Sequence, residues 1–80
     1  LNAKMLGYTS VNIGNITIGA GGYYMYDAKD ISKNILFVTL GYWQNANGTF
    51  SLNGYYNSIY IIGDPGTTIG GLIVRVWYYK

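Results

Sequence analysis

The sequence predicts an all-β domain: a small antiparallel β-sandwich of jelly-roll-like type, with six to seven strands. Twelve glycines, a single proline, ten tyrosines and many β-branched residues favour strands over helices. Apolar residues also alternate in short runs, and Gly, Asn and Asp clusters separate these runs at the spacing of turns in sandwiches. No helical segment or internal repeat is visible, so we interpret residues 1–80 as one β-sandwich domain.

The first half of the chain contains the less regular strands. Apolar positions before Gly14-Asn15 are odd-numbered and those after it are even-numbered, which indicates a bulge or a tight turn at that point. The segment 20–22, Ala-Gly-Gly, interrupts the chain before an aromatic strand at 23–26. The polar, charged segment 27–34 is expected to be a connecting loop.

The clearest strand spans residues 35–43 and is apolar on both faces. Leu36, Val38, Leu40 and Tyr42 alternate with Ile35, Phe37, Thr39 and Trp43. A strand of this kind is normally covered on both sides, which predicts a second sheet on one side and a neighbouring subunit on the other.

Two hairpins are expected after this strand. Asn47-Gly48 is the expected tip of the first. Strands at 49–52 and 55–62 are expected to meet at Asn53-Gly54, because both of these residues tolerate positive φ.

The last strand is expected at residues 69–79, after a turn at Asp64-Pro65-Gly66. Gly70-Gly71 indicates a bend or bulge at its start. The second half of the chain is therefore interpreted as an antiparallel meander.

The composition predicts self-association. Half of the residues are hydrophobic and 10% are charged, against roughly 25% charged in a typical soluble domain. Cysteine is absent, so disulfides cannot stabilise so small a domain. Excess apolar surface is best placed in a subunit interface and in a binding face, which favours a homo-oligomer. Because the chain begins with Leu1, we expect it to be a fragment of a longer protein.

Charge and hydropathy argue against two classes of partner. The formal net charge is only +2, without the basic stripe of a nucleic-acid-binding protein. No apolar run approaches the roughly 18 residues that a membrane-spanning segment needs, so membrane insertion is not expected.

The inventory of reactive residues predicts a protein without enzymatic activity, cofactor or metal. Histidine and cysteine are absent, which excludes Ser-His-Asp and Cys-His mechanisms. Asp27, Asp30 and Asp64 are the only acidic side chains, and a catalytic pair or a calcium site among them is the alternative. A solvated loop for the first two and a turn for the third is the favoured interpretation.

Recognition by aromatic and amide side chains remains, and it suits a saccharide. A sugar ring stacks its C–H face on an aromatic ring while its hydroxyl groups bond to amides. The candidate ligand-binding residues occupy the two expected hairpins and are Tyr42, Trp43, Gln44, Asn45, Asn47, Asn53, Tyr55, Tyr56 and Asn57. Core, interface or turn roles are the alternative for each of them. Packing or intersubunit contact is the favoured interpretation for Tyr23, Tyr24, Tyr26, Trp77, Tyr78 and Tyr79.

Four segments together resemble a known family. These are ITIGAGG at 16–22, ILFVTL at 35–40, NSIYII at 57–62 and GLIVRVW at 71–77. Their order resembles that in the C-terminal receptor-binding (head or tip) domains of bacteriophage tail fibres and similar receptor-binding proteins. The resemblance implies a homotrimer at the fibre tip of a virion, outside the cell, that recognises a bacterial surface saccharide. Two alternatives are a trimerisation cap that ends a fibre, and a carbohydrate-binding module of a secreted hydrolase.

Overall fold

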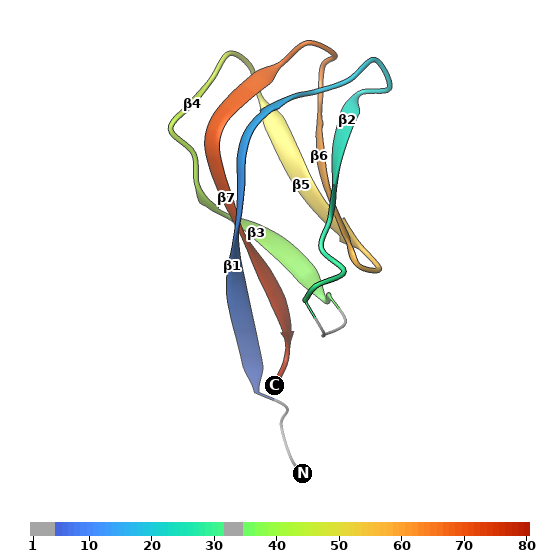
Figure 1. The fold of residues 1–80 in the computed structure, drawn as a ribbon, viewed down its shortest axis with the longest axis vertical. Coiled ribbons are helices and arrows are strands. Elements are labelled where there is room, and N and C mark those ends of the chain that lie inside the picture. The colour runs from blue at the N-terminus through green and yellow to red at the C-terminus, as the bar shows by residue number, and fades with distance from the viewer. Residues whose placement is uncertain (1–4, 32–34) are drawn as a thin grey trace.

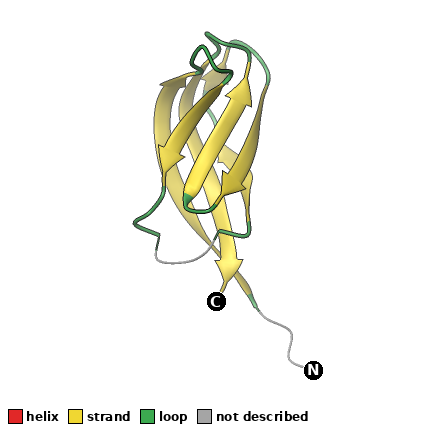
Figure 2. Cartoon of the chain, turned by 90° about the vertical axis from the view of Figure 1, so that its right-hand side faces the viewer, coloured by secondary structure: helices red, strands yellow, loops and turns green. Residues whose placement is uncertain are grey.

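The computed structural model describes residues 5–31 and 35–80, and this part of the chain consists of β-strands joined by turns and loops (Figures 1 and 2). The strands are β1 (Leu6–Thr17), β2 (Tyr23–Asp27), β3 (Phe37–Tyr42), β4 (Asn45–Ala46), β5 (Phe50–Tyr55), β6 (Ser58–Gly63) and β7 (Thr68–Tyr79). Across the described residues there is no helix of the length and apolarity that crossing a bilayer requires. The predicted all-β class is confirmed.

The strands form two antiparallel sheets that pack face to face. In the first sheet β7 lies in the centre, β1 pairs with one edge of it, and β3 followed by the short β4 pairs with the other. In the second sheet β6 lies between β2 and β5. This is the two-layer arrangement expected of a β-sandwich.

A two-stranded ribbon bends from one sheet into the other at the upper end of the molecule in Figure 1. The β1–β2 and β6–β7 connections run side by side there. The Ile18 amide donates to the Thr67 carbonyl at 2.8 Å, and the Gly63 amide donates to the Gly22 carbonyl at 3.1 Å. The pairs β1·β7 and β2·β6 therefore continue one ribbon around the corner, which agrees with the jelly-roll-like arrangement expected from the sequence.

The core lies between the sheets and consists of small and branched aliphatic side chains. Its buried members are Ile16, Ile18, Ala28, Ile59, Ile61, Ile69, Leu72, Val74 and Val76. Alternate residues of β6 and β7 supply most of them, because successive side chains of a strand point to opposite faces. The outward-facing residues of β7 are Ile73, Arg75 and Trp77.

Two bulges interrupt the β1–β7 ladder, and both were indicated by glycines. The register shifts between Asn12 and Gly14, and again between Gly14 and Ile16 opposite Gly70-Gly71. Gly14 and Gly71 have φ of 85° and 64°, a region that glycine adopts without steric cost. The parity change at Gly14 is thus a bulge within one strand.

The predicted turn at Asn53-Gly54 is wrong. Tyr55 pairs with Ser58, so Tyr56 and Asn57 form the turn of the β5–β6 hairpin, and Tyr56 has a φ of 54°. Gly54 instead faces the interior of the sandwich. A Cβ atom at this position would lie 2.9 Å from Ile35 Cγ2, so the glycine permits close packing of the two sheets.

The predicted meander is also wrong, because β5 and β6 form the only hairpin between consecutive long strands in the described residues. The chain passes from β3 and β4 in the first sheet to β5 in the second. It then returns from β6 to β7, and the predicted turn at Asp64-Pro65-Gly66 makes that crossing, with the Thr67 amide donating to the Asp64 carbonyl at 3.1 Å. Alternation predicted the strands but not the sheet to which each belongs.

The strand predicted at 35–43 corresponds to β3, with a bulge at Gly41. Leu40 pairs with Val74, and Tyr42 pairs with Ile73, so the bulge moves Tyr42 to the outer face of the first sheet. The predicted loop at 27–34 begins with a turn in which the Lys29 amide donates to Asp27 Oδ1 at 3.0 Å. Residues 32–34 lie outside the described residues.

Candidate ligand-binding site

The nine predicted site residues do not form one site, because the two segments that carry them lie at opposite ends of the sandwich. Residues 42–47 surround β4 at the upper end of Figure 1, and the β5–β6 hairpin lies at the lower end of the second sheet, at about mid-height of the picture. Asn53, Tyr55, Tyr56 and Asn57 belong to this hairpin. The Tyr55 and Tyr56 rings pack edge to face with centroids 4.4 Å apart.

The upper group divides again between two sides of the chain. Trp43 faces an apolar groove between the edges of the two sheets. Gln44 and Asn45 line a polar pocket on the outer face of the first sheet. Asn47 has a structural role. Its side-chain Oδ1 accepts a hydrogen bond from the backbone N–H of Thr68 at 2.8 Å, and its backbone N–H donates to the Thr68 carbonyl.

We call the polar hollow the amide pocket. It has a volume of about 390 Å³ and lies where the upper parts of β1, β7 and β4 meet. Its lining residues are Asn15, Ile16, Thr17, Gln44, Asn45, Thr68, Ile69 and Gly70. This set contains three carboxamides and two hydroxyl groups and no charged side chain, so its chemistry suits an uncharged ligand rich in hydroxyl groups.

Glycines in β7 allow the amides to lie over its backbone. The backbone N–H of Gln44 donates to the Gly70 carbonyl at 2.8 Å, and this hydrogen bond attaches the β3–β4 segment to β7. A Cβ atom on Gly70 would lie 2.5 Å from Asn45 Oδ1, and one on Gly71 would lie 3.1 Å from Gln44 Cβ. The bulge at Gly70-Gly71 therefore creates the space in which both amides lie.

The amides of the pocket differ in their remaining hydrogen-bonding capacity. Asn15 Oδ1 accepts from the Gly71 amide at 2.9 Å, which holds this side chain in place and leaves its NH₂ group as a donor. Gln44 and Asn45 are exposed, and within the described residues neither side chain forms a hydrogen bond. Two complete carboxamides are thus available to a ligand.

The apolar groove is the larger hollow, at about 680 Å³, and it runs along the edge where β3 and β4 face β5. The Trp43 and Phe50 rings pack edge to face, with centroids 6.2 Å apart. Val38, Leu40 and Leu52 form much of the remaining wall. Its polar lining consists of Thr39, Thr49 and Ser51, so it offers no amide to a sugar and is the weaker saccharide site.

Sequence reasoning missed the three polar side chains that β1 and β7 contribute to the amide pocket. Asn15, Thr17 and Thr68 belong to β1 and β7; Asn15 was assigned to a bulge or a tight turn, and no binding role was expected for Thr17 or Thr68. The one sequence signal for a site here was Asn15, a polar side chain next to Gly14 at the point where the alternation of apolar residues stops. These residues lie close to Gln44 and Asn45 because β1 and β4 both pair with β7. A local sequence pattern does not reveal which strands pair with one another.

Comparisons of the chain with protein-family models, with curated proteins and with solved structures find no match. Among the described residues, no three His, Cys, Asp or Glu side chains lie together in a metal-binding arrangement. The amide pocket is accordingly interpreted from its own chemistry.

Proposed function

We propose that this chain is a non-enzymatic saccharide-binding domain, and that the amide pocket binds the ligand. Three side-chain carboxamides and two hydroxyl groups line the pocket, and no charged side chain does. Two of these carboxamides form no hydrogen bond within the described residues, and this observation carries the proposal. Neutral amides form the paired hydrogen bonds that sugar hydroxyl groups offer, and they impose no charge on the ligand.

We further propose that the domain is the receptor-binding tip of a bacteriophage tail fibre, where the saccharide belongs to the bacterial surface. The order of the four segments resembling such domains supports this, together with the sandwich fold. The proposed location is the virion, at the fibre tip. A trimerisation cap that binds nothing is the second candidate, because many large apolar side chains are exposed.

The exposed apolar side chains support a homo-oligomer, with a trimer as the proposed state. On the outer face of the second sheet, Tyr23, Met25 and Ile62 are each 41–49% exposed. Met25 pairs with Tyr60 and Tyr23 with Ile62 in the ladder, so they form one continuous patch. This patch lies on the sheet opposite the amide pocket, so a neighbouring chain could cover it and leave the pocket open.

Substituting the pocket amides tests the saccharide proposal. We expect Asn45→Ala and Gln44→Ala each to weaken binding about three- to tenfold on an array of bacterial surface polysaccharides, because each removes hydrogen bonds to a ligand hydroxyl. Asn53→Ala is the matched control. Asn53 is equally an exposed asparagine but lies in β5 of the other sheet, so binding should be unchanged.

Two results would contradict the proposal in different ways. Full binding by both pocket variants would remove the amide pocket as the site. Absence of binding by the unsubstituted chain, together with loss of assembly when the domain is deleted from a fibre, would favour the trimerisation cap.

A further inference from the structure

A row of three aromatic rings crosses the outer face of the first sheet below the amide pocket. Tyr8 of β1 and Phe37 of β3 are both paired with Trp77 of β7 in the ladders. The Tyr8 and Trp77 ring centroids lie 4.8 Å apart, and Phe37 stacks on Trp77 at 5.7 Å with an interplanar angle of 17°. Tyr8 and Phe37 remain 48% and 43% exposed, so the row presents ring surface to solvent.

The orientation of the central ring is held by a hydrogen bond. Trp77 Nε1 donates to Thr39 Oγ1 at 2.8 Å, which satisfies the indole N–H and fixes the ring against its own sheet. A fixed aromatic surface loses little conformational entropy when a ligand stacks on it. This row is therefore organised for stacking in the absence of any ligand.

Arg75 lies beside the row, and among the described residues its guanidinium group forms no ion pair with a carboxylate. Its guanidinium carbon lies 5.0 Å from the centroid of the Tyr8 ring, and its ladder neighbours are Ser10 and Thr39. The charge is therefore held over a ring and flanked by hydroxyl groups. Such a guanidinium group keeps its donors available for an anion.

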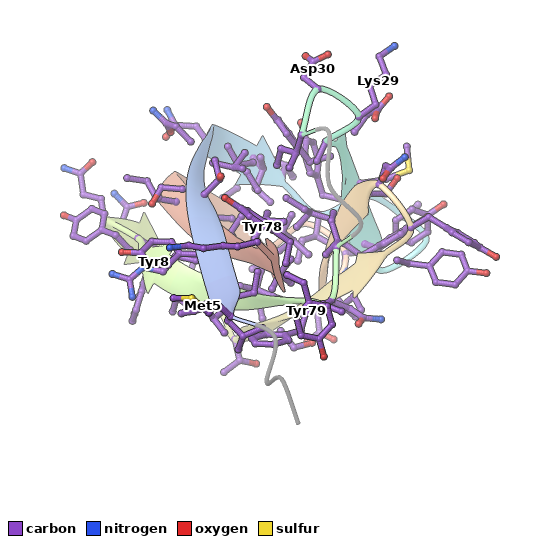
Figure 3. The ribbon with its side chains drawn as sticks, turned by 90° about the horizontal axis from the view of Figure 1, so that it is seen from below. Met5, Tyr8, Lys29, Asp30, Tyr78 and Tyr79 are labelled. Carbon is purple, nitrogen blue, oxygen red and sulfur yellow. The ribbon has the colours of Figure 1, made fainter. Side chains whose placement is uncertain are left out.

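The three acidic side chains of the chain lie elsewhere. Asp27 ends β2 in the second sheet, Asp30 lies in the loop that follows, and Asp64 lies in the β6–β7 turn. Figure 3 shows Asp30 and Lys29 on a loop well separated from Tyr8. Arg75 consequently gives this face a positive charge that the outer residues of β1, β7 and β3 do not neutralise.

We propose that the aromatic row and Arg75 form a second subsite, which binds an acidic sugar residue of the same saccharide; this rests on the proposed saccharide-binding function. The apolar side of a uronic-acid-type sugar packs against the exposed ring surface of Tyr8 and Phe37, which Trp77 holds between them, and its carboxylate accepts hydrogen bonds from the Arg75 guanidinium. The amide pocket holds a neutral residue of the same chain.

The two subsites lie along one strand and on one face. Arg75 and Gly70 are five residues apart on β7, which corresponds to roughly 16 Å in an extended strand. Tyr42 and Ile73 pair on this face between them. A continuous outer surface thus connects an aromatic, positively charged end with a neutral amide-rich end, which fits an oligosaccharide that carries both kinds of unit.

The experiment compares acidic bacterial polysaccharides in two forms: native, and with the uronic-acid carboxyl groups chemically reduced to alcohols. We expect the domain to bind the native form about tenfold more tightly in titration calorimetry, because the reduced form loses the charge-assisted bonds to Arg75. Arg75→Gln should abolish this preference, so that the native and reduced forms bind the variant equally, each no more tightly than the reduced form binds the unsubstituted domain. Lys29→Gln alters the net charge equally at a distant loop, and the preference should persist.

Four other results would contradict the acidic subsite. Equal binding of both forms, or a preference that persists in Arg75→Gln, would overturn the acidic subsite and leave the proposed amide-pocket function standing. Equally tight binding of poly-glutamate would show that the face recognises acidic chains in general, and would also overturn it. If the unsubstituted domain binds neither form of any polysaccharide, both proposals are wrong. Circular dichroism of Arg75→Gln confirms that the fold is retained.

Discussion

Gly70 illustrates how one residue without a side chain determines the position of another residue's amide. It lies in β7 directly below Asn45, and its missing Cβ leaves the space that Asn45 Oδ1 occupies. The backbone φ of Gly70 is not in the left-handed region, so close approach rather than conformation explains the glycine here.

Replacing Gly70 by alanine should therefore move the Asn45 amide without unfolding the sheet. The atom that must shift is the far end of an exposed side chain, so we expect the free energy of unfolding to change by less than about 1 kcal/mol. Saccharide binding should fall by about three- to tenfold, as in Asn45→Ala. Urea titration and the polysaccharide array measure the two effects.

Gly19→Ala provides the control for this substitution. A Cβ atom on Gly19 would make only an ordinary contact, 3.6 Å from the Tyr23 carbonyl oxygen, and Gly19 lies outside the pocket. Unchanged binding by Gly70→Ala, with a normal response of Asn45→Ala, would show that the glycine does not position the amide.

Individual residues were predicted with uneven success for a physical reason. The composition of residues 42–47 correctly indicated exposed aromatic and amide side chains, and Gln44 and Asn45 lie together in a pocket. Asn47 is instead bonded to the β7 backbone at Thr68. A short segment reveals which side chains are polar, but a backbone partner 21 residues away decides which of them remain available.

At the level of elements, the contact between β3 and β5 distinguishes the observed fold from the expected one. Gly54 and Asn53 were expected to form a turn, and they lie instead within β5 with opposite orientations. Gly54 faces Ile35 and Val38 across the sandwich, whereas Asn53 is exposed on the outer face of the second sheet.

Substitutions at these two neighbours should therefore have different effects on stability. Gly54→Ala places a methyl group 2.9 Å from Ile35 Cγ2 and 3.3 Å from Val38 Cγ1, and we expect it to lower the free energy of unfolding by about 1–3 kcal/mol. Asn53→Ala should change it by less than about 0.5 kcal/mol. Urea denaturation of both variants gives the comparison, and a large cost for Asn53→Ala would indicate a turn at this position after all.

Strand positions were predictable, whereas strand partners were not. Alternation of apolar residues correctly indicated the strand at 69–79. An irregularity was also expected at Gly14-Asn15, as a bulge or a tight turn, and at Gly70-Gly71, as a bend or a bulge, and both are bulges. The sheet to which a strand belongs depends on which pairing buries the most apolar surface over the whole chain. A strand such as β3, apolar on both faces, satisfies several such pairings locally.

On the scale of the whole molecule, the two outer faces differ in composition. The outer face of the first sheet carries the amide pocket, Arg75 and the aromatic row. The outer face of the second sheet carries the apolar patch of Tyr23, Met25 and Ile62. This difference is the reason why we propose ligand binding for the first sheet and self-association for the second.

Charge placed on the apolar patch should therefore separate the subunits. We expect the unsubstituted domain to sediment with the mass of three chains, and the double variant Met25→Lys, Ile62→Lys to sediment as a single chain, because a buried lysine without a partner opposes association. Sedimentation equilibrium measures the mass.

Asn12→Lys is the matched control for this variant. Asn12 is exposed and lies opposite Ile73 on the outer face of the first sheet, so this added charge should leave the assembly intact. Dissociation by Asn12→Lys alone would assign the interface to the first sheet, and a monomeric unsubstituted domain would contradict self-association altogether.

The pairing of Leu6 with Tyr79 brings the start of β1 and the end of β7 to one pole of the sandwich, and the amide pocket lies toward the other (Figure 1). A surface or carrier attached through either of these strand ends would hold the domain at the pole opposite the amide pocket. The pocket would then point away from the support, so immobilisation at residue 80 should leave it free to meet a large polysaccharide.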